Sequence, residues 1–216
     1  MFPTQQDIGT ISKRIKSQMS FYKKAVHKAH QTYLTPMVLS LLKDPSCFVS
    51  QVARHFQEAM PLMEKRILRA IHSPKMTLEQ LMDAHLTRLR HYMATVSFDK
   101  LLIYADLSDL AKPHAKKMPY LDRVRDGSES RPGKVKTNPG FWLDEIYVQF
   151  PGRKTFPVVF YPFSTLEKGF RSITDLIVRH ISLVFQVLGN NGLWISDRGY
   201  DALKFFCISS IITGNS

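Results

Sequence analysis

The spacing of hydrophobic residues changes near residue 98, and this change constrains the fold more than any other feature of the chain. Before it, apolar residues recur every three or four positions, as they do from Ile11 to Tyr33, and form one apolar stripe. This spacing is typical of amphipathic helices. Four prolines are expected to divide the region into short helical stretches: Pro36, Pro45, Pro61 and Pro74. We therefore expect an all-helical domain over residues 1–95.

A capping box marks the start of the last helix in this region. Thr77 stands before an apolar stripe that begins at Leu78, and Gln80 follows three residues after the threonine. In this pattern the threonine hydroxyl accepts from the third amide of the helix, and the glutamine side chain reaches back to the threonine amide. The pattern predicts a helix that begins directly after Thr77.

After residue 98 the pattern becomes that of strands. The continuous apolar run from Leu101 to Ala105 predicts a strand covered on both faces, which stops at Asp106. Residues 112–140 are rich in Pro, Gly, Lys and Arg and are expected to form an irregular, exposed connection. Residues 141–150 and 156–163 then predict a hairpin with a turn at residues 151–153.

A helix and a further strand follow the hairpin. Apolar residues spaced three or four apart predict a helix over residues 165–188, ended by Gly189. Residues 193–195 predict a second buried strand, which runs into Asp197. Three strands followed by a helix and a strand form the arrangement of the ribonuclease H-like sheet. The sequence thus predicts an α/β fold, an incomplete ribonuclease H-like mixed sheet over residues 96–216 preceded by the helical domain.

The net charge of +12 limits the partners of the protein. Such an excess of Lys and Arg favours a polyanion as the binding partner, and nucleic acid is favoured over an anionic membrane surface. Cys47 and Cys207 lie far apart, which excludes a zinc ribbon and a disulfide scaffold and favours a reducing compartment. No apolar run is long enough to span a membrane, and a signal pattern is absent from the first residues. We expect a cytoplasmic protein that does not enter a membrane.

Asp106 and Asp197 are the candidate catalytic and metal-binding residues, because each follows an apolar strand. Side chains at the carboxyl ends of strands point into the crevice where ligands bind, and the two carboxylates converge if their strands are neighbours. Carboxylate oxygens suit Mg²⁺ or Mn²⁺, and such ions activate water at a phosphodiester. In the alternative interpretation each aspartate caps the helix that follows it. Asp109 is expected to be either an outer-sphere partner of Asp106 at the metal site or a solvated turn residue.

The residues around both aspartates resemble the first two acidic motifs of DDE transposases of the IS4 type. The motifs read IYADLSDLAK at residues 103–112 and WISDRGYD at residues 194–201, and DRVRDGS at residues 122–128 resembles the segment that connects them. The resemblance implies a transposase that cleaves and joins DNA with Asp106 and Asp197 as catalytic metal ligands. It also implies double-stranded transposon ends as the substrate, bound by the basic helical domain of residues 1–95. A homodimer in the synaptic complex and association with the nucleoid are further implications.

The family carries a third catalytic residue, a Glu in a Tyr, Arg, Glu, Lys pattern well beyond the second aspartate. That pattern is absent from this sequence, in which Glu129, Glu145 and Glu167 all precede Asp197. The resemblance therefore predicts the N-terminal portion of such an enzyme, with impaired cleavage. A DNA-binding remnant without catalysis is the alternative, and a nuclease that resolves branched DNA irrespective of sequence is a third hypothesis.

Basic side chains near both motifs are the candidate DNA contacts, because Lys and Arg neutralise phosphates. The alternative for the connection is a solvated loop, and the alternative for Arg198 is a surface salt bridge. The candidates are Lys112, Lys116, Lys117, Arg123, Arg125 and Arg198.

Overall fold

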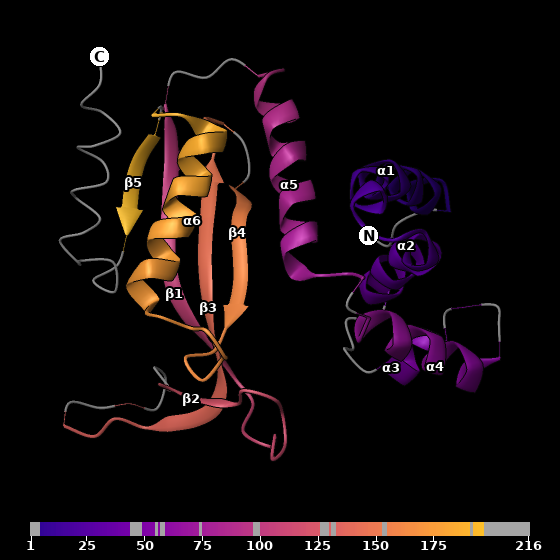
Figure 1. Ribbon diagram of the computed structural model, residues 1–216. Helices are drawn as coiled ribbons and strands as arrows, with labels where there is room; N and C mark the ends of the chain where they lie inside the picture. Colours follow the sequence, from indigo (N-terminus) through magenta and orange to yellow (C-terminus); the bar gives the residue numbers. More distant parts are fainter. Residues whose placement is uncertain are drawn as a thin grey trace. The chain divides into compact units, whose positions relative to one another are not determined.

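The computed structural model describes residues 5–43, 49–54, 56, 59–73, 75–96, 100–125, 130, 133–152, 155–190 and 192–196. The chain forms two compact units, Met1–Arg88 and Leu89–Ser216. The described part of the first unit is helical, and the second is built on a mixed five-stranded sheet (Figure 1). The predicted α/β class is therefore confirmed.

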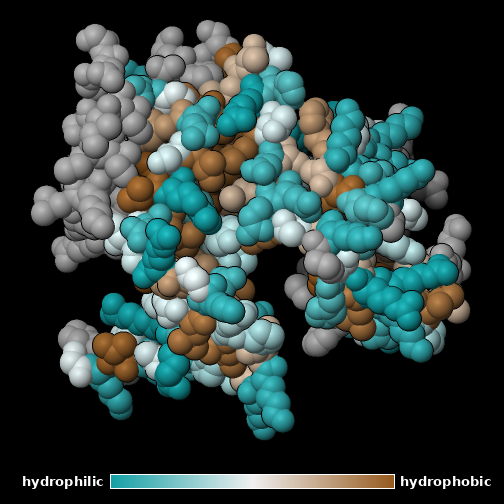
Figure 2. All heavy atoms as spheres, in the orientation of Figure 1, coloured by the Kyte–Doolittle hydropathy of each residue, from teal (hydrophilic) through white to brown (hydrophobic). Residues whose placement is uncertain are grey.

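Helices make up the first unit, as the apolar spacing predicts. Hydrophilic side chains cover much of the surface of these helices on the face drawn in Figure 2. The helices are α1 (Gln5–Ala25), α2 (Lys28–Lys43), α3 (Val49–Ala53), α4 (Met60–Ile71) and α5 (Leu78–Met93), whose last residues belong to the second unit.

The apolar stripe of residues 11–33 is divided between two helices, because α1 ends at Ala25 and α2 begins at Lys28. Val26, in the break, is buried, whereas Ile11 is exposed. Pro36 lies inside α2 and does not divide helices, so the prediction for this proline is wrong. Pro61 lies in the first turn of α4, where the missing amide hydrogen costs nothing.

The core of the first unit lies between α3 and α4. It includes Val52, Ala53, Met63 and Ile67, which are all buried. The predicted capping box is confirmed at the start of α5: the Gln80 amide donates to Thr77 Oγ1 over 3.2 Å, and the Thr77 amide donates to Gln80 Oε1 over 3.1 Å.

Three antiparallel strands and one parallel strand form the body of the sheet in the second unit. Its elements are β1 (Leu101–Ala111), β2 (Asp122–Arg125), β3 (Thr137–Gln149), β4 (Thr155–Phe163), α6 (Ile173–Leu188) and β5 (Gly192–Ser196). β3 pairs antiparallel with β1 on one side and with β4 on the other, while β5 pairs parallel with β1. The short β2 pairs with the first residues of β3. Across the sheet the order is thus β4, β3, β1, β5 (Figure 1).

The hairpin of β3 and β4 agrees with the prediction, and Gly152 adopts a φ of +67° in its turn. The helix was predicted from residue 165 but α6 begins only at Ile173, so the prediction is wrong for the first eight residues. The reason is Ser172, whose side chain caps the helix by accepting from the Asp175 amide over 3.0 Å. The predicted end at Gly189 is confirmed, and its amide donates to the Phe185 carbonyl oxygen over 2.8 Å.

The two faces of the sheet differ in burial. Side chains alternate between faces along each strand, and α6 lies across one of them, which we call the α6 face (Figure 1). Buried residues of β1 and β3 on the α6 face include Ile103, Ala105, Ile146 and Val148. On the opposite face, which we call the Asp106 face, most side chains of β1 and β3 are half-buried or exposed.

The prediction that the first and last strands are buried on both faces is wrong. Trp194 of β5 lies against Phe185 of α6 with 5.5 Å between ring centroids, whereas Leu193 is 62% exposed and Ile195 is 43% exposed. In β1, residues alternate between buried and half-buried up to Ala105. Among the described residues of β1, full burial is confined to the face that α6 covers.

The connection predicted for residues 112–140 is more regular than expected, since it contains β2 and the start of β3. Gly140 lies between β1 and β2 and pairs with both Ala111 and Asp122. A Cβ atom at this position would lie only 2.6 Å from the Leu110 carbonyl oxygen and 2.7 Å from Val124 Cγ2. Glycine is therefore needed where three strands meet.

Candidate functional site

Asp106 lies in the middle of β1 rather than at its end, so the prediction that the strand stops at this residue is wrong. The strand continues to Ala111 because β3, with 13 residues, pairs with it from Leu102 to Ala111. Asp106 is exposed, and Ser108 Oγ donates a hydrogen bond to its Oδ2 over 2.9 Å. Asp109 is a strand residue rather than a turn residue, and strand alternation places it on the opposite face from Asp106.

β5 is the parallel neighbour of β1, which is the condition for the two motifs to converge. The paired residues run from Leu101 with Gly192 to Ala105 with Ser196. The pairing thus ends at the residues that immediately precede Asp106 and Asp197. Asp197 and Arg198 themselves lie outside the described residues.

Glu145 of β3 lies directly opposite Asp106, a neighbour that the sequence analysis missed. Directly opposed side chains of antiparallel strands have Cβ atoms about 5 Å apart, and like charges there repel. The Tyr147 hydroxyl donates to Glu145 Oε1 over 2.6 Å. This hydrogen bond, burial and the negative charges of Glu145 and Asp106 together raise the pKa of Tyr147 to about 12. The predicted strands of residues 101–105 and 141–150 were the available signal, but only the register between β1 and β3 identifies the residue opposite Asp106.

The donor set at Asp106 suits a hard divalent cation. Asp106 and Glu145 offer carboxylate oxygens, the ligand type that Mg²⁺ and Mn²⁺ take. A group of three or more His, Cys, Asp or Glu side chains that could hold a metal is not found among the described residues. The described part of the chain thus contributes two such carboxylates at this place.

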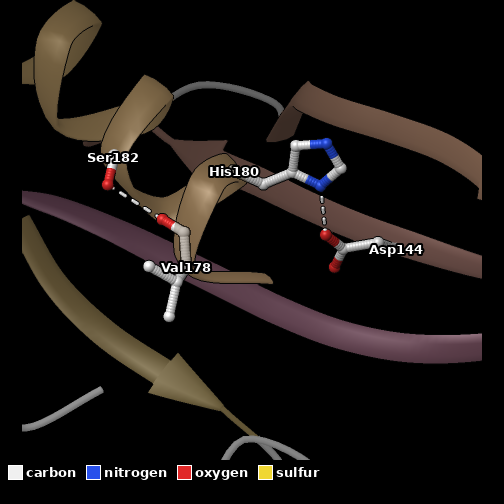
Figure 3. A network of polar contacts seen from close by, with 4 residues as sticks. All are labelled: Asp144, Val178, His180 and Ser182. Atoms are coloured by element: carbon white, nitrogen blue, oxygen red, sulfur yellow. Dashed lines mark hydrogen bonds and ion pairs between the residues drawn. The ribbon is translucent and has the colours of Figure 1, made fainter. Parts of the chain in front are cut away.

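A second acidic residue of β3, Asp144, is buried on the α6 face and also escaped the sequence analysis. Its Oδ2 lies 2.5 Å from Nδ1 of His180 of α6, and both side chains are fully buried (Figure 3). His180 Nε2 has no hydrogen-bond partner among the described residues, and the Tyr161 ring lies against the imidazole with 4.9 Å between centroids. His180 falls on the predicted apolar stripe of the helix, which was the signal for its burial. The pair ties α6 to the sheet and faces away from Asp106.

The basic segment, which we define as residues 112–125, is held in place at both ends. The Lys112 amide donates to the Pro139 carbonyl oxygen over 2.7 Å. At the other end Asp122 Oδ2 accepts from the amide and the hydroxyl of Thr165, over 3.0 and 2.5 Å. Burial raises the pKa of Asp122, but the hydrogen bonds from Thr165 and Arg123 outweigh burial and lower it overall. The segment is therefore anchored at both ends, and its last four residues form β2.

The predicted DNA-contacting residues of this segment are all exposed: Lys112, Lys116, Lys117, Arg123 and Arg125. The guanidinium of Arg123 is used within the protein, since its Nη2 donates to Thr137 Oγ1 over 2.8 Å. The three lysines and Arg125 take no part in that hydrogen bond. Between them, Tyr120 is 48% exposed and adopts a φ of +56°, which bulky residues rarely do.

Comparisons with protein-family models and with curated proteins find no match to this chain. In the described part of the chain, no helix has the length and apolar character needed to cross a membrane. The resemblance to DDE transposases therefore stays a prediction from the sequence motifs.

Proposed function

We propose that the protein is a DDE transposase of the IS4 type, which binds the DNA ends of a transposon and cleaves and joins them in the presence of Mg²⁺ or Mn²⁺, with activity impaired because this sequence lacks the third acidic motif of the family. One observation carries the proposal. β1 and β5 are parallel neighbours, and their pairing runs up to the residues immediately before Asp106 and Asp197. Two motifs 91 positions apart in the sequence are thus carried by adjacent strands that point the same way.

The order of the strands supports a ribonuclease H-like sheet within this proposal. β1, β3 and β4 are antiparallel neighbours in chain order, and α6 then leads to β5 on the other side of β1. Both the three antiparallel strands and the following helix and strand correspond to that arrangement. β2 is an addition at the edge of β3, within the connection between the first two main strands.

The residues at Asp106 support the binding of a cation. Asp106 and Glu145 repel each other across two strands, and a divalent cation beside them offsets that repulsion. The Ser108 and Tyr147 hydroxyl groups each donate to one of these carboxylates and restrict its orientation. When bound, the ion activates water and stabilises the leaving oxygen at a phosphodiester. Asp106 would hold the ion from β1, and Asp197 is the second ligand that the motifs imply.

Nicking of a supercoiled plasmid in Mg²⁺ or Mn²⁺ by the purified chain tests the proposal. We expect Asp106→Asn and Asp197→Asn to lower the nicking rate by about 100-fold or more, because outer-sphere partners alone are worth 10- to 100-fold. Asp109→Asn is the matched control, since it removes one carboxylate from the same strand on the opposite face. Nicking at the wild-type rate by Asp106→Asn would refute the assignment of this residue.

The ordered basic segment favours a second candidate, a DNA-binding protein without catalysis. Its lysines are exposed while its ends are fixed by Asp122 and the Lys112 amide. Salt-dependent DNA binding without nicking in either metal, in wild type and variants alike, would favour this candidate. Cleavage of four-way junctions irrespective of sequence would instead favour a junction-resolving nuclease.

A further inference from the structure

The short helix α3 and the longer helix α4 pack together in the first unit (Figure 1). Their shared core is formed by Val52 and Ala53 of α3 and by Met63 and Ile67 of α4. Ala53 is fully buried, so a larger side chain at this position would push the two helices apart. The partly buried side chains packed against this core are Tyr33 and Met37 of α2, Val49 of α3, and Phe56. Three successive helices therefore contribute to one core.

A turn of six residues, 54–59, joins α3 to α4. It begins directly after α3, where the Phe56 amide donates to the Ala53 carbonyl oxygen over 3.2 Å. It ends at Ala59, whose carbonyl oxygen accepts from the amides of Leu62 and Met63 over 3.0 and 3.1 Å. The turn is longer than the three or four residues usual in a helix-turn-helix, but Phe56 anchors it in the shared core. Two helices joined by an anchored turn correspond to that motif.

The outward side of α4 combines positive charge with exposed apolar side chains. The buried residues that define the inward side of α4 are Met63, Ile67 and Ala70. With 3.6 residues per turn, Lys65 and Arg69 fall on the outward side, and both are exposed. Beside them, Leu62 is 47% exposed and Leu68 is 38% exposed. We call these four residues the outer row of α4. The single carboxylate of α4, Glu64, is half-buried and does not belong to this row.

We infer that α3 and α4 form a helix-turn-helix, and that α4 lies in the major groove of double-stranded DNA and recognises its base pairs. In this motif the second helix enters the groove. Lys and Arg pair there with O6 and N7 of guanine, and apolar side chains contact the methyl group of thymine. The outer row supplies both kinds of side chain. The inference rests on the proposed function, since it names the element that recognises the transposon ends.

The dimensions of the outer row fit a short run of base pairs. Leu62 and Arg69 are seven residues apart, which is about 10 Å along the helix and about the length of three base pairs. A groove about 12 Å wide admits one α-helix. The outer row can therefore contact about three successive base pairs.

The first unit also has the charge that binding of a duplex requires. Residues 1–88 hold 13 Lys and Arg and six Asp and Glu. Contacts of cations with phosphates give affinity for any sequence, whereas contacts with base edges give the preference for one sequence. The cations of α1 are Lys13, Arg14, Lys16, Lys23 and Lys24. Mutations in α1 and in α4 can therefore separate general affinity from sequence preference.

Selection from a pool of duplexes with a random segment of about 20 base pairs, two turns of DNA, tests the inference. The full chain binds the pool in EDTA, where metal-dependent cleavage does not occur, and the bound duplexes are amplified and sequenced. We expect the wild type to enrich one sequence motif. Lys65→Ala and Arg69→Ala should each bind the enriched duplex about 10-fold more weakly in fluorescence anisotropy and lose the preference at some of its positions. Because alanine favours helices, both variants should keep the melting temperature of the wild type.

Lys16→Ala is the matched control, because it removes an exposed cation from another helix of the same unit. It should weaken binding of all duplexes alike, if at all, and enrich the wild-type motif. A wild type that enriches no motif would overturn the inference, as would the wild-type motif and affinity in both α4 variants. An equal loss for enriched and random duplexes would also overturn it and assign Lys65 and Arg69 to phosphate contacts. Conversion of a dimer to a monomer by Leu62→Ser, with the motif unchanged, would overturn it in favour of an interface between two copies of the chain.

The inference and the proposed catalysis can fail separately. If wild type and Asp106→Asn enrich the same α4-dependent motif, but nicking is absent in Mg²⁺ and Mn²⁺, the proposed catalysis is refuted and α4 remains the recognition helix. If nicking depends on Asp106 but the enriched motif does not depend on Lys65 or Arg69, only the assignment of α4 is refuted.

Discussion

Asp144 and Glu145 are consecutive residues of β3 with opposite environments. Asp144 is fully buried beneath α6 beside His180, whereas Glu145 lies on the other face of the sheet opposite Asp106. Strand alternation alone separates them. One carboxylate is compensated by a histidine within the fold, and the other faces a like charge. The buried carboxylate is paired within the fold, whereas the cation site proposed above lies at the opposed carboxylates of Asp106 and Glu145.

The largest expected effect comes from removing the imidazole on the buried side. His180→Leu leaves the Asp144 carboxylate in the interior without its histidine partner, and we expect a loss of about 3–5 kcal/mol in the free energy of unfolding. Urea denaturation measures this loss. Removal of both groups in Asp144→Leu/His180→Leu should restore much of the stability, because a buried pair can be replaced by apolar side chains at little cost. A double variant as unstable as the sum of its single variants would contradict the role of the pair.

A smaller effect of opposite sign is expected on the other face. Asp106→Asn removes the repulsion from Glu145, so in the absence of divalent cations it should stabilise the protein by about 0.5 kcal/mol. Mg²⁺ should then raise the melting temperature of the wild type but not of the variant, because the variant has lost a ligand. Asp109→Asn should respond to Mg²⁺ as the wild type does. A melting temperature of the wild type that Mg²⁺ leaves unchanged would contradict a cation site at Asp106.

The smallest effect concerns Tyr147, which reports on the charge of the exposed pair. Its pKa, about 12, is raised above the ordinary value of about 10 by the hydrogen bond to Glu145, by burial and by the charges of Glu145 and Asp106. A raised pKa stabilises the folded state fully below about pH 10, and this stabilisation is lost as the pH rises through 12. Ultraviolet titration should show a lower Tyr147 pKa in Glu145→Gln and a smaller decrease in Asp106→Asn. An unchanged pKa in both variants would disprove the proximity of these groups.

Local signals predicted the parts of the fold that depend on neighbouring residues. The capping box at Thr77, the turn at Gly152 and the helix end at Gly189 all agree with the structure, because each depends on a few consecutive residues. Ser172 was an equally local signal for the start of α6, but the longer apolar periodicity concealed it. The prediction extended the helix across eight residues that precede this cap.

The surroundings of the candidate site depend on pairing between distant residues and could not be predicted in the same way. The position of Asp106 in mid-strand follows from the length of β3, and its neighbour Glu145 follows from the register between the two strands. The contact of Asp144 with His180 joins residues 36 positions apart in different elements. Strand alternation and helical periodicity place each of them on a face, but neither pattern identifies the partner across the interface.

The pairing of β5 with β1 has a consequence for the order in which the sheet assembles. The β3 and β4 strands meet across a short turn, whereas Leu101 and Gly192 close a chain of 91 positions. The entropy lost in closing a loop grows with its length, and β5 offers only five residues to compensate for it. We expect β5 to join the sheet after the hairpin has formed and to leave it first on unfolding. The two motifs would then come together only in the final stage of folding. Mild denaturation would separate them while the remaining strands stay paired.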